Sequence, residues 1–223
     1  MTRGIAVAID GPAGAGKSTV SKLLAQRAGL QLLDTGAMYR AFTWAWLSDM
    51  RANSATRPID SARNHEIEVV YRDGQTVVQC DGVDISLEIR QPEVTARVSE
   101  VAAVPAVREM AVAMQRQLVE TNVESGIGVV LEGRDIGTTV LPDATIKFFL
   151  NADSRERALR RALENGANAD LVPAEIEERD RADSEREVSP LRAASDAIHI
   201  DATHLTPEQV VDVMMDAINA NSI

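Results

Sequence analysis

The 223-residue sequence predicts an α/β fold: a five-stranded parallel sheet with helices on both faces and a phosphate loop after the first strand. The apolar run at residues 4–9 leads directly into G-x-x-x-x-G-K-S at residues 11–18. Four further apolar runs, typical of strands buried on both faces, lie at residues 31–33, 127–131, 145–150 and 197–200. Because helical patterns separate most of these runs, we expect ligands at the carboxyl ends of the strands.

The loop at residues 11–18 contains the residue types that a bound triphosphate requires. Its glycines can adopt positive φ, so that successive backbone N–H groups wrap a phosphate. Lys17 can reach the β- and γ-phosphates, and the hydroxyl of Ser18 is the expected Mg²⁺ ligand. The predicted ATP-binding residues of the loop are Gly11, Pro12, Ala13, Gly14, Ala15, Gly16, Lys17, Ser18 and Thr19.

Three helices have recognisable ends in the sequence. The first begins near Lys17 and stops at Gly29. Because it begins at the end of the loop, its N-terminal end, the positive end of the helix dipole, points at the phosphates. A second opens at Asp153 and closes near Gly166. The last has Thr206 as N-cap, Pro207 at its first position and a glutamine three residues after the cap, a pattern that predicts a capping box.

A different pattern interrupts the alternation of strands and helices. Residues 66–85 alternate polar with apolar side chains between Asp-Gly turns, which predicts a small antiparallel meander. One long amphipathic helix is expected from about Pro92 to Glu120. We therefore expect one phosphate-loop domain over residues 1–223, with an inserted lobe at about residues 60–100.

Composition limits the possible partners. With 23 basic and 34 acidic residues the formal charge is −11, so the surface as a whole should repel nucleic acid. The single cysteine excludes an intrachain disulfide, and no apolar segment reaches the ~18 residues that a membrane span needs. We expect a soluble cytoplasmic protein that acts on small molecules. The sequence shows no coiled-coil heptads, which is consistent with a monomer.

Three polar clusters are candidates for binding the second substrate. Residues 34–40, after the second strand, bring a hydroxyl, a phenol ring and a guanidinium to the sheet edge, which suits a monophosphate clamp. Residues 132–135 place Arg134 and Asp135 at the end of the third core strand. Arg179, Asp183 and Arg186 have the spacing of one helix face. The alternatives are a surface arginine at the first cluster, a structural ion pair at the second and a solvated helix face at the third.

Arginines are also dense on the helix expected after residue 153. Arg155, Arg157, Arg160 and Arg161 suggest a mobile lid at about residues 153–170 that closes over ATP, with Arg157 and Arg161 as its ATP contacts. An exposed helix in which glutamates balance the arginines explains the same composition equally well. Phosphoryl transfer favours the functional interpretation, because it depends on positioning and on several cations around the transferred group.

The phosphate loop alone leaves several enzyme classes open. The sequence contains neither an N-K-x-D guanine motif nor an early D-x-x-G switch, which disfavours a GTPase. A nucleotide kinase is the leading hypothesis. The alternatives are a kinase of another small molecule, such as a hydroxy acid, and an ATPase switch that needs no acceptor.

Nearly the whole chain resembles the bacterial cytidylate kinases. The resemblance is carried by the motifs at residues 9–18, 33–40, 132–138 and 178–186. It implies a nucleoside monophosphate kinase fold with core, insert and lid. It also implies transfer of the γ-phosphate of ATP to CMP or dCMP with Mg²⁺, in pyrimidine nucleotide metabolism.

By matched position, the resemblance also implies roles for individual residues. Lys17, Arg134, Arg179 and Arg186 would surround the reacting phosphates. The residues that would bind CMP are Thr35, Tyr39, Arg40, Ser99, Arg108, Arg134, Asp135, Arg179, Asp183 and Arg186. Among these, Ser99, Arg108 and Asp135 would meet the cytosine, consistent with an arginine and a carboxylate reading the acceptor and donor of its edge.

Two positions depart from the family pattern. Position 35 is usually serine, and the extra methyl group of Thr35 would narrow the pocket. The loop ends in Lys-Ser-Thr, where some relatives have glycine before threonine, so the assignment of Ser18 as the Mg²⁺ ligand is less direct.

Overall fold

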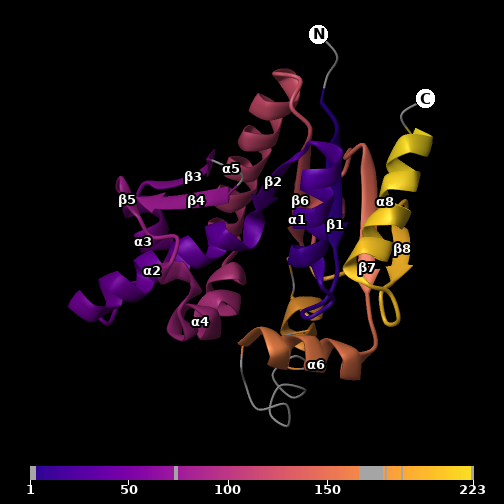
Figure 1. Ribbon diagram of the computed structural model, residues 1–223. Helices are drawn as coiled ribbons and strands as arrows, with labels where there is room; N and C mark the ends of the chain where they lie inside the picture. Colours follow the sequence, from indigo (N-terminus) through magenta and orange to yellow (C-terminus); the bar gives the residue numbers. More distant parts are fainter. Residues whose placement is uncertain (1–3, 73–74, 166–177, 179, 187, 222–223) are drawn as a thin grey trace. The chain divides into compact units, whose positions relative to one another are not determined.

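The computed structural model describes residues 4–72, 75–165, 178, 180–186 and 188–221 (Figure 1). These residues form two compact units, of which the first comprises residues 1–31 and 119–223 and the second residues 32–118. The chain passes between the units within strand β2 and within helix α5.

A parallel sheet of strand order β2-β6-β1-β7-β8 organises the first unit. The pairs β1–β6, β1–β7 and β7–β8 are all parallel. The core strands are almost fully buried because both faces carry apolar side chains; Val7, Ile9, Leu131 and Leu150, for example, have no exposed surface. The strands are β1 (Ala6–Asp10), β2 (Gln31–Asp34), β6 (Val129–Gly133), β7 (Ile146–Asn151) and β8 (Ile198–Asp201). The five predicted strands are thus confirmed.

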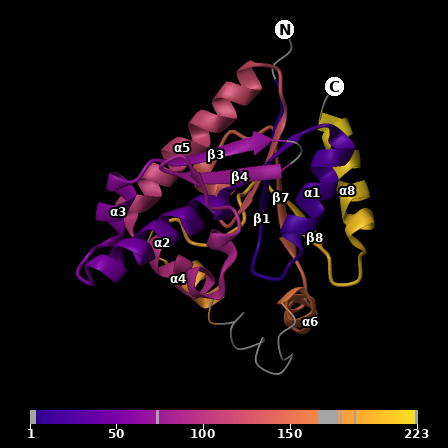
Figure 2. The same ribbon diagram turned by 60° about the vertical axis from the view of Figure 1, so that its left-hand side comes forward.

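Helices α1 (Lys17–Ala28) and α8 (Pro207–Asn221) lie side by side along this sheet (Figures 1 and 2). Helix α1 ends at Gly29, whose left-handed conformation at φ 64° closes the last turn as predicted. The capping box of α8 is also confirmed: the backbone N–H of Thr206 donates to Oε1 of Gln209 at 2.9 Å, and that of Gln209 donates to Oγ1 of Thr206 at 3.3 Å.

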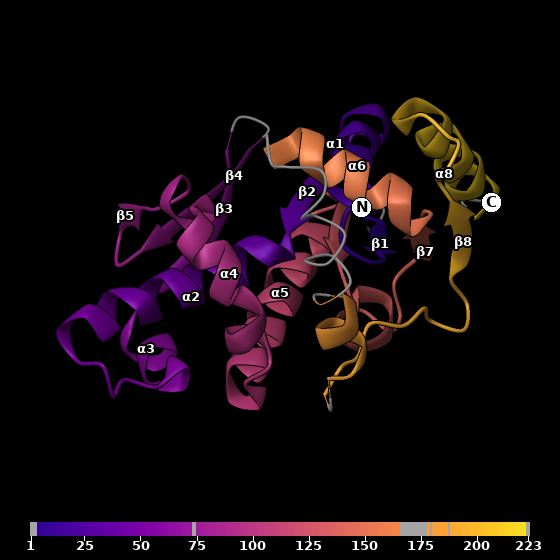
Figure 3. The same cartoon turned by 90° about the horizontal axis from the view of Figure 1, so that it is seen from below.

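Helix α6 (Ser154–Asn165) crosses the end of the sheet at which the phosphate loop lies (Figure 3). It begins one residue after the predicted start, and Gly166, its expected end, lies outside the described residues. Residues 178 and 180–184 are also helical. The prediction that one helix carries Arg179, Asp183 and Arg186 is wrong at its end, because the helix stops before Arg186.

The second unit combines helices with a small antiparallel sheet of order β3-β4-β5, which confirms the predicted meander (Figure 1). Helix α2 contacts α3, α4 and the β3–β4 hairpin. Cys80 of β4 is buried in the apolar core beneath them. The elements are α2 (Thr35–Ala52), α3 (Pro58–Asn64), β3 (Ile67–Arg72), β4 (Gln75–Cys80), β5 (Val83–Asp84), the 3₁₀ turn η1 (Glu88–Arg90), α4 (Pro92–Ala102) and α5 (Pro105–Glu124).

The single long helix expected from Pro92 to Glu120 is wrong. The structure has two helices, α4 and α5, separated at Ala103 and Val104. Pro105 is the cause, because proline lacks the N–H that a continuous helix would use and disfavours the helical conformation of the residue before it. Pro105 instead occupies the first position of α5, where the missing N–H is not needed. No helix of the described residues is long and apolar enough to cross a membrane.

Candidate active site

The phosphate loop adopts the conformation that its glycines predict. Gly14 and Gly16 have φ of 72° and 89°. Gly16 is the N-cap of α1 and has no side chain to satisfy the first N–H groups of the helix, so those groups point to the place of a bound anion. A side chain at Gly14 would lie 2.7 Å from the backbone oxygen of Arg157, so the close packing of α6 also requires glycine there.

Lys17 lies inside the loop and is 7% exposed. Its Nζ donates to the carbonyl oxygens of Gly11 at 2.8 Å and Pro12 at 2.7 Å. These bonds hold the ammonium among backbone groups that wrap phosphate, so that phosphate oxygens can become its acceptors. The position agrees with the phosphate-binding role predicted for this lysine.

Ser18 and Glu132 form a pair of oxygen donors beside the loop. The hydroxyl of Ser18 donates to Oε2 of Glu132 at 3.0 Å, and Glu132 is the fourth residue of β6. Two oxygens in adjacent positions around Mg²⁺, each about 2.1 Å from the ion, are about 3 Å apart. The pair therefore fits a magnesium ion. Ser18 was the predicted metal ligand, and Glu132 was not predicted to be one.

Arg134 pairs with a carboxylate from a later segment and not with its neighbour Asp135. Its Nε lies 2.8 Å from Oδ2 of Asp183, and Nη2 of Arg186 lies 3.8 Å from Oδ1 of the same carboxylate. The side chains of Asp183 and Arg186 are only 8% and 10% exposed, which excludes the solvated helix face considered above. The structure thus brings three predicted site residues together in the first unit. Arg179, the fourth member of this predicted set, lies outside the described residues.

Helix α6 supplies arginines to the phosphate loop. Nη1 of Arg157 donates to the carbonyl oxygen of Ala13 at 2.9 Å and pairs with Asp180, which in turn accepts the backbone N–H of Ala13 at 3.0 Å. A Cβ atom at Gly16 would lie 3.7 Å from Nη1 of Arg160. Arg157 therefore lies at the phosphate loop, and Arg160 and Asp180 join it although they were not predicted site residues. The side chain of Arg161 is outside the described part.

Asp10, the last residue of β1, is 3% exposed and was also missed. Burial raises the pKa of Asp10 to about 6, although backbone N–H groups of Gly137 and Ile136 oppose the rise. Nearby Asp135 raises this pKa further and Lys17 lowers it. One signal was present in the sequence, since Asp10 is a charged residue at the end of an apolar strand and directly before the loop.

In the second unit, the predicted monophosphate residues gather at the beginning of α2. Thr35 is the first residue of this helix and is 4% exposed. Its N-cap, Asp34, accepts the backbone N–H of Ala37 at 3.1 Å. Arg40 lies one turn further and donates from Nη1 to Oγ1 of Thr95 at 2.7 Å. The surface arginine considered as an alternative is excluded, because Arg40 is partly buried and held by this bond.

The predicted base-binding residues of this unit lie on α4 and α5. The guanidinium of Arg108 lies 5.5 Å from the ring centroid of Tyr39, and Arg108 is 3% exposed. This is a cation–π contact, which favours a guanidinium held in one orientation. Ser99 is half-buried on α4. The structure therefore connects Tyr39 with Arg108; among the described residues, the side chain of Ser99 forms no hydrogen bond to either.

A charged cluster away from these residues joins three elements of the same unit. His65 lies between Asp49 of α2 and Asp81 of the turn after β4, at 3.1 Å from Nε2 to Oδ1 and 2.6 Å from Nδ1 to Oδ2, respectively. Asp49 also accepts a hydrogen bond from Ser61 of α3 at 2.6 Å. The hydrogen bond to Asp81 is the main cause that raises the pKa of His65.

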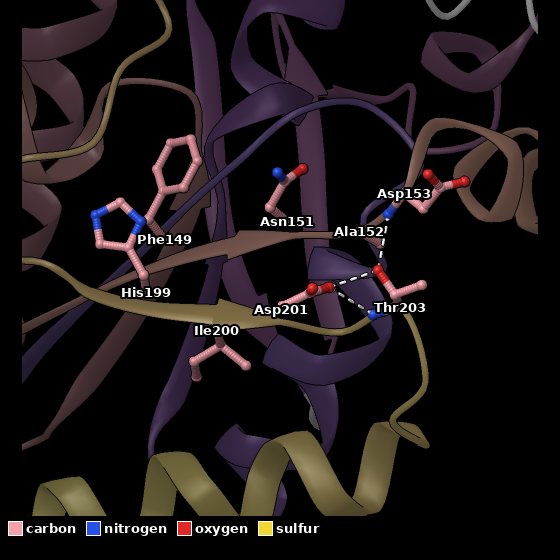
Figure 4. Close-up of a pocket in the computed structure, with 8 residues that line it drawn as sticks. All are labelled: Phe149, Asn151, Ala152, Asp153, His199, Ile200, Asp201 and Thr203. Carbon is pink, nitrogen blue, oxygen red and sulfur yellow. Dashed lines mark hydrogen bonds between the residues drawn. The ribbon is translucent and has the colours of Figure 1, made fainter.

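A pocket lies at the carboxyl ends of β7 and β8 in the first unit (Figure 4). Asp201 accepts both the backbone N–H and the hydroxyl of Thr203, and that hydroxyl oxygen accepts the backbone N–H of Asp153 (Figure 4). None of the predicted site residues lines it. Its carboxylates would repel a phosphate, so we do not place the triphosphate there.

Comparison with known proteins is consistent with this arrangement. A family model described as cytidylate kinase matches residues 7–220. The chain is 47% identical to a cytidylate kinase of Limosilactobacillus fermentum (strain NBRC 3956 / LMG 18251), with 95% of this chain and 94% of that protein covered. It is also 47% identical to one of Geobacillus sp. (strain WCH70), where both coverages are 98%.

Two further similarities concern chain length and fold. A bifunctional pantoate ligase/cytidylate kinase of Synechococcus sp. (strain WH7803) is 48% identical over 97% of this chain, which spans 45% of that protein. A crystal structure of an uncharacterized protein from Eubacterium ventriosum ATCC 27560 has a TM-score of 0.54 at 13% identity, covers 96% of this chain and 98% of its own, and shows a shared fold alone. With the family model matched over residues 7–220 and relatives at 47% identity over almost their whole length, the chain belongs to the cytidylate kinase family.

Proposed function

We propose that this chain transfers the γ-phosphate of ATP to CMP or dCMP, giving ADP and CDP or dCDP. Family membership supports the reaction, and the phosphate loop with Lys17 buried inside it is the single observation that carries the donor side. The formal charge of −11 supports small nucleotides as partners in preference to nucleic acid.

On the donor side, residues 11–19 bind the phosphates of ATP through backbone N–H groups. Lys17 donates to the β- and γ-oxygens, and Arg157 holds the loop in shape through the carbonyl oxygen of Ala13. Arg161 is proposed as a further ATP contact. Mg²⁺ held by Ser18 and Glu132 would supply neutralisation of the phosphate charge.

On the acceptor side, the first two turns of α2 bind the monophosphate. Thr35 offers its hydroxyl and Arg40 its guanidinium, and the N-terminal end of a helix favours the anion. Tyr39, Ser99 and Arg108 bind the nucleoside part. Arg40 now donates to Thr95 and to the carbonyl oxygen of Ile89, so a phosphate would replace neutral acceptors with a charged one.

The arginines around Asp183 stabilise the transferred group. Arg134 and Arg186 share this carboxylate, which fixes two guanidinium groups at one place. Arg179 is proposed to join them. Asp183 also holds the sugar and Asp135 accepts the amino group of cytosine, so that uracil, with an acceptor in that place, would leave a buried carboxylate unpaired.

The deciding experiment measures ADP formation from Mg-ATP without acceptor and then with CMP, dCMP, UMP, AMP and shikimate. We expect CMP and dCMP to stimulate ADP formation far above the blank and the other three to do so weakly. Equal turnover with and without acceptor would replace the proposal by an ATPase switch. Stimulation by shikimate alone would assign a different small-molecule kinase.

A further inference from the structure

The carboxylate of Asp10 joins the end of β1 to the loop that follows β6. Its Oδ1 accepts the backbone N–H of Ile136 at 2.8 Å, and its Oδ2 accepts that of Gly137 at 2.7 Å. Both bonds are buried. One side chain therefore holds two consecutive peptide groups directly after Asp135.

These two peptide groups begin a short π-helical turn, Ile136–Val140. The first N–H groups of any helical turn lack partners within the turn, and an aspartate placed just before it usually accepts one of them. Asp135 occupies that place but makes no such side-chain bond. Asp10 supplies the cap from another strand, so the carboxylate of Asp135 is not needed for this local task.

The loop is also confined by close packing at Gly137. A Cβ atom there would lie 3.1 Å from Cδ of Lys147 and 3.4 Å from Oδ2 of Asp10. Lys147 is itself fixed, because its Nζ pairs with Asp196 at 2.8 Å. The turn after Asp135 is thus held by hydrogen bonds to the carboxylate of Asp10 and by packing against the side chain of Lys147.

We propose that Asp10 is a positioning residue for base recognition, which aligns Arg134 and Asp135 by holding the turn behind them. The inference rests on the proposed role of Asp135 in reading cytosine. Asp10 also directly precedes Gly11, the first residue of the phosphate loop. The residue that holds the turn after Asp135 therefore lies at the start of the loop that binds ATP. The carboxylates of Asp10 and Asp135 interact electrostatically, which agrees with their proximity.

The test is Asp10→Asn, assayed with CMP and with UMP at saturating ATP. Asparagine keeps one acceptor oxygen, but its amide N–H would face the second backbone N–H. Because two donors cannot bond to each other, the π-helical turn must shift. Misplacement of a binding group by about 1 Å can cost on the order of 100-fold in rate. We expect kcat/KM for CMP to fall by about that factor and the CMP-to-UMP ratio to fall with it.

The matched control is Asp201→Asn. Asp201 ends β8 as Asp10 ends β1, and its carboxylate accepts the backbone N–H and hydroxyl of Thr203 in the following loop. The same chemical change there should leave the CMP-to-UMP ratio at its wild-type value. An equal fall in both variants, or a fall of kcat/KM in Asp10→Asn by one factor for both nucleotides, would overturn the inference.

A second variant disturbs the contact between Asp10 and Gly137 by changing the glycine. Gly137→Ala keeps Asp10 intact but adds a methyl group against Lys147 and Asp10. We expect the CMP-to-UMP ratio to fall in this variant as well. It decides the question if Asp10→Asn does not fold, and an unchanged ratio in folded Gly137→Ala would then count against the inference.

Asp135→Asn separates this inference from the proposed function. If Asp135→Asn lowers the ratio and Asp10→Asn does not, only the positioning role fails. If Asp135→Asn leaves the ratio unchanged, the base-reading role fails and the inference falls with it. If Asp10 acts through Asp135, the double variant should show a smaller loss of ratio than the product of the two single losses.

Discussion

At the scale of single residues, Lys17 has the clearest proposed role in ATP binding. Lys17→Ala should lower kcat by at least about 100-fold, the usual cost of removing one preorganised donor from a transition state. Lys22→Ala is the control, because Lys22 is exposed on the same helix α1. Steady-state assays with CMP measure both. A loss in Lys22→Ala as large as in Lys17→Ala would point to damage of the helix and not of the phosphate site.

Asp10 gives a second prediction at this scale, in the dependence of stability on pH. Burial raises the pKa of Asp10 from 3.8 to about 6. The folded protein thus favours the protonated carboxyl, and this contribution is complete below pH 3.8 and lost as pH rises through about 6. Two pKa units correspond to about 3 kcal/mol. The charged groups acting on this carboxyl are Asp135 and Lys17.

In practice, urea unfolding at pH 4 and pH 7 should show a smaller pH-dependent loss of stability in Asp10→Asn than in the wild type. Asp201→Asn provides the reference, because its carboxylate is exposed. Identical pH dependence in wild type and Asp10→Asn would mean that the buried carboxyl does not titrate in this range.

At the scale of elements, local sequence rules predicted the ends of helices better than their continuity. Gly29, Thr206 and Gln209 act through bonds to their own neighbours, so their patterns specify structure directly. The apolar spacing across residues 92–120 predicts one helix, but it counts only the side chains. Pro105 breaks that helix through the backbone, and the sequence contained this signal although the apolar pattern outweighed it.

The cluster of Asp49, His65 and Asp81 joins α2, the start of β3 and the turn after β4. The pKa of His65 is raised mainly by its hydrogen bond to Asp81, and the bond to Asp49 adds to it. A protonated histidine therefore stabilises the second unit below pH 6.5, and this contribution is lost as pH rises through the raised pKa.

We expect the wild type to lose stability relative to His65→Gln as the pH rises above 6.5, measured as the shift of the thermal midpoint in each buffer. His199→Gln is the control, since His199 makes no ion pair among the described residues and only a tilted ring contact with Phe149. If the thermal midpoints of wild type and His65→Gln change in parallel with pH, the charge on His65 does not stabilise the second unit.

At the scale of the whole molecule, the sequence was sufficient for the fold class. It did not predict which distant charges meet. Asp180 bonds to Ala13 and Asp183 to Arg134 across long sequence separations, and no local pattern encodes such pairs. Glu132 was visible at a strand end, but its bond to Ser18 depends on how β6 lies beside β1.

The separation into two units predicts which segments each nucleotide protects. In hydrogen exchange, Mg-ATP alone should protect residues 11–19, and CMP alone should protect the first turns of α2. Binding at 100 times Kd should also stabilise the protein by about 2.7 kcal/mol. UMP at the same concentration is the control for CMP. Equal protection of both segments by either nucleotide alone would contradict the assignment of donor and acceptor residues.

The buried position of Cys80 makes the protein suitable for site-specific labelling. Cys80 is 4% exposed, and burial raises its pKa to about 11, so little thiolate forms near neutral pH. A chromogenic disulfide reagent should therefore leave the native protein unmodified and react once the hairpin unfolds in urea; rapid reaction of the native protein would contradict this. The reaction of Cys80 then reports unfolding of the second unit as a change in absorbance. A fluorophore can also be attached to one introduced surface cysteine without first removing Cys80.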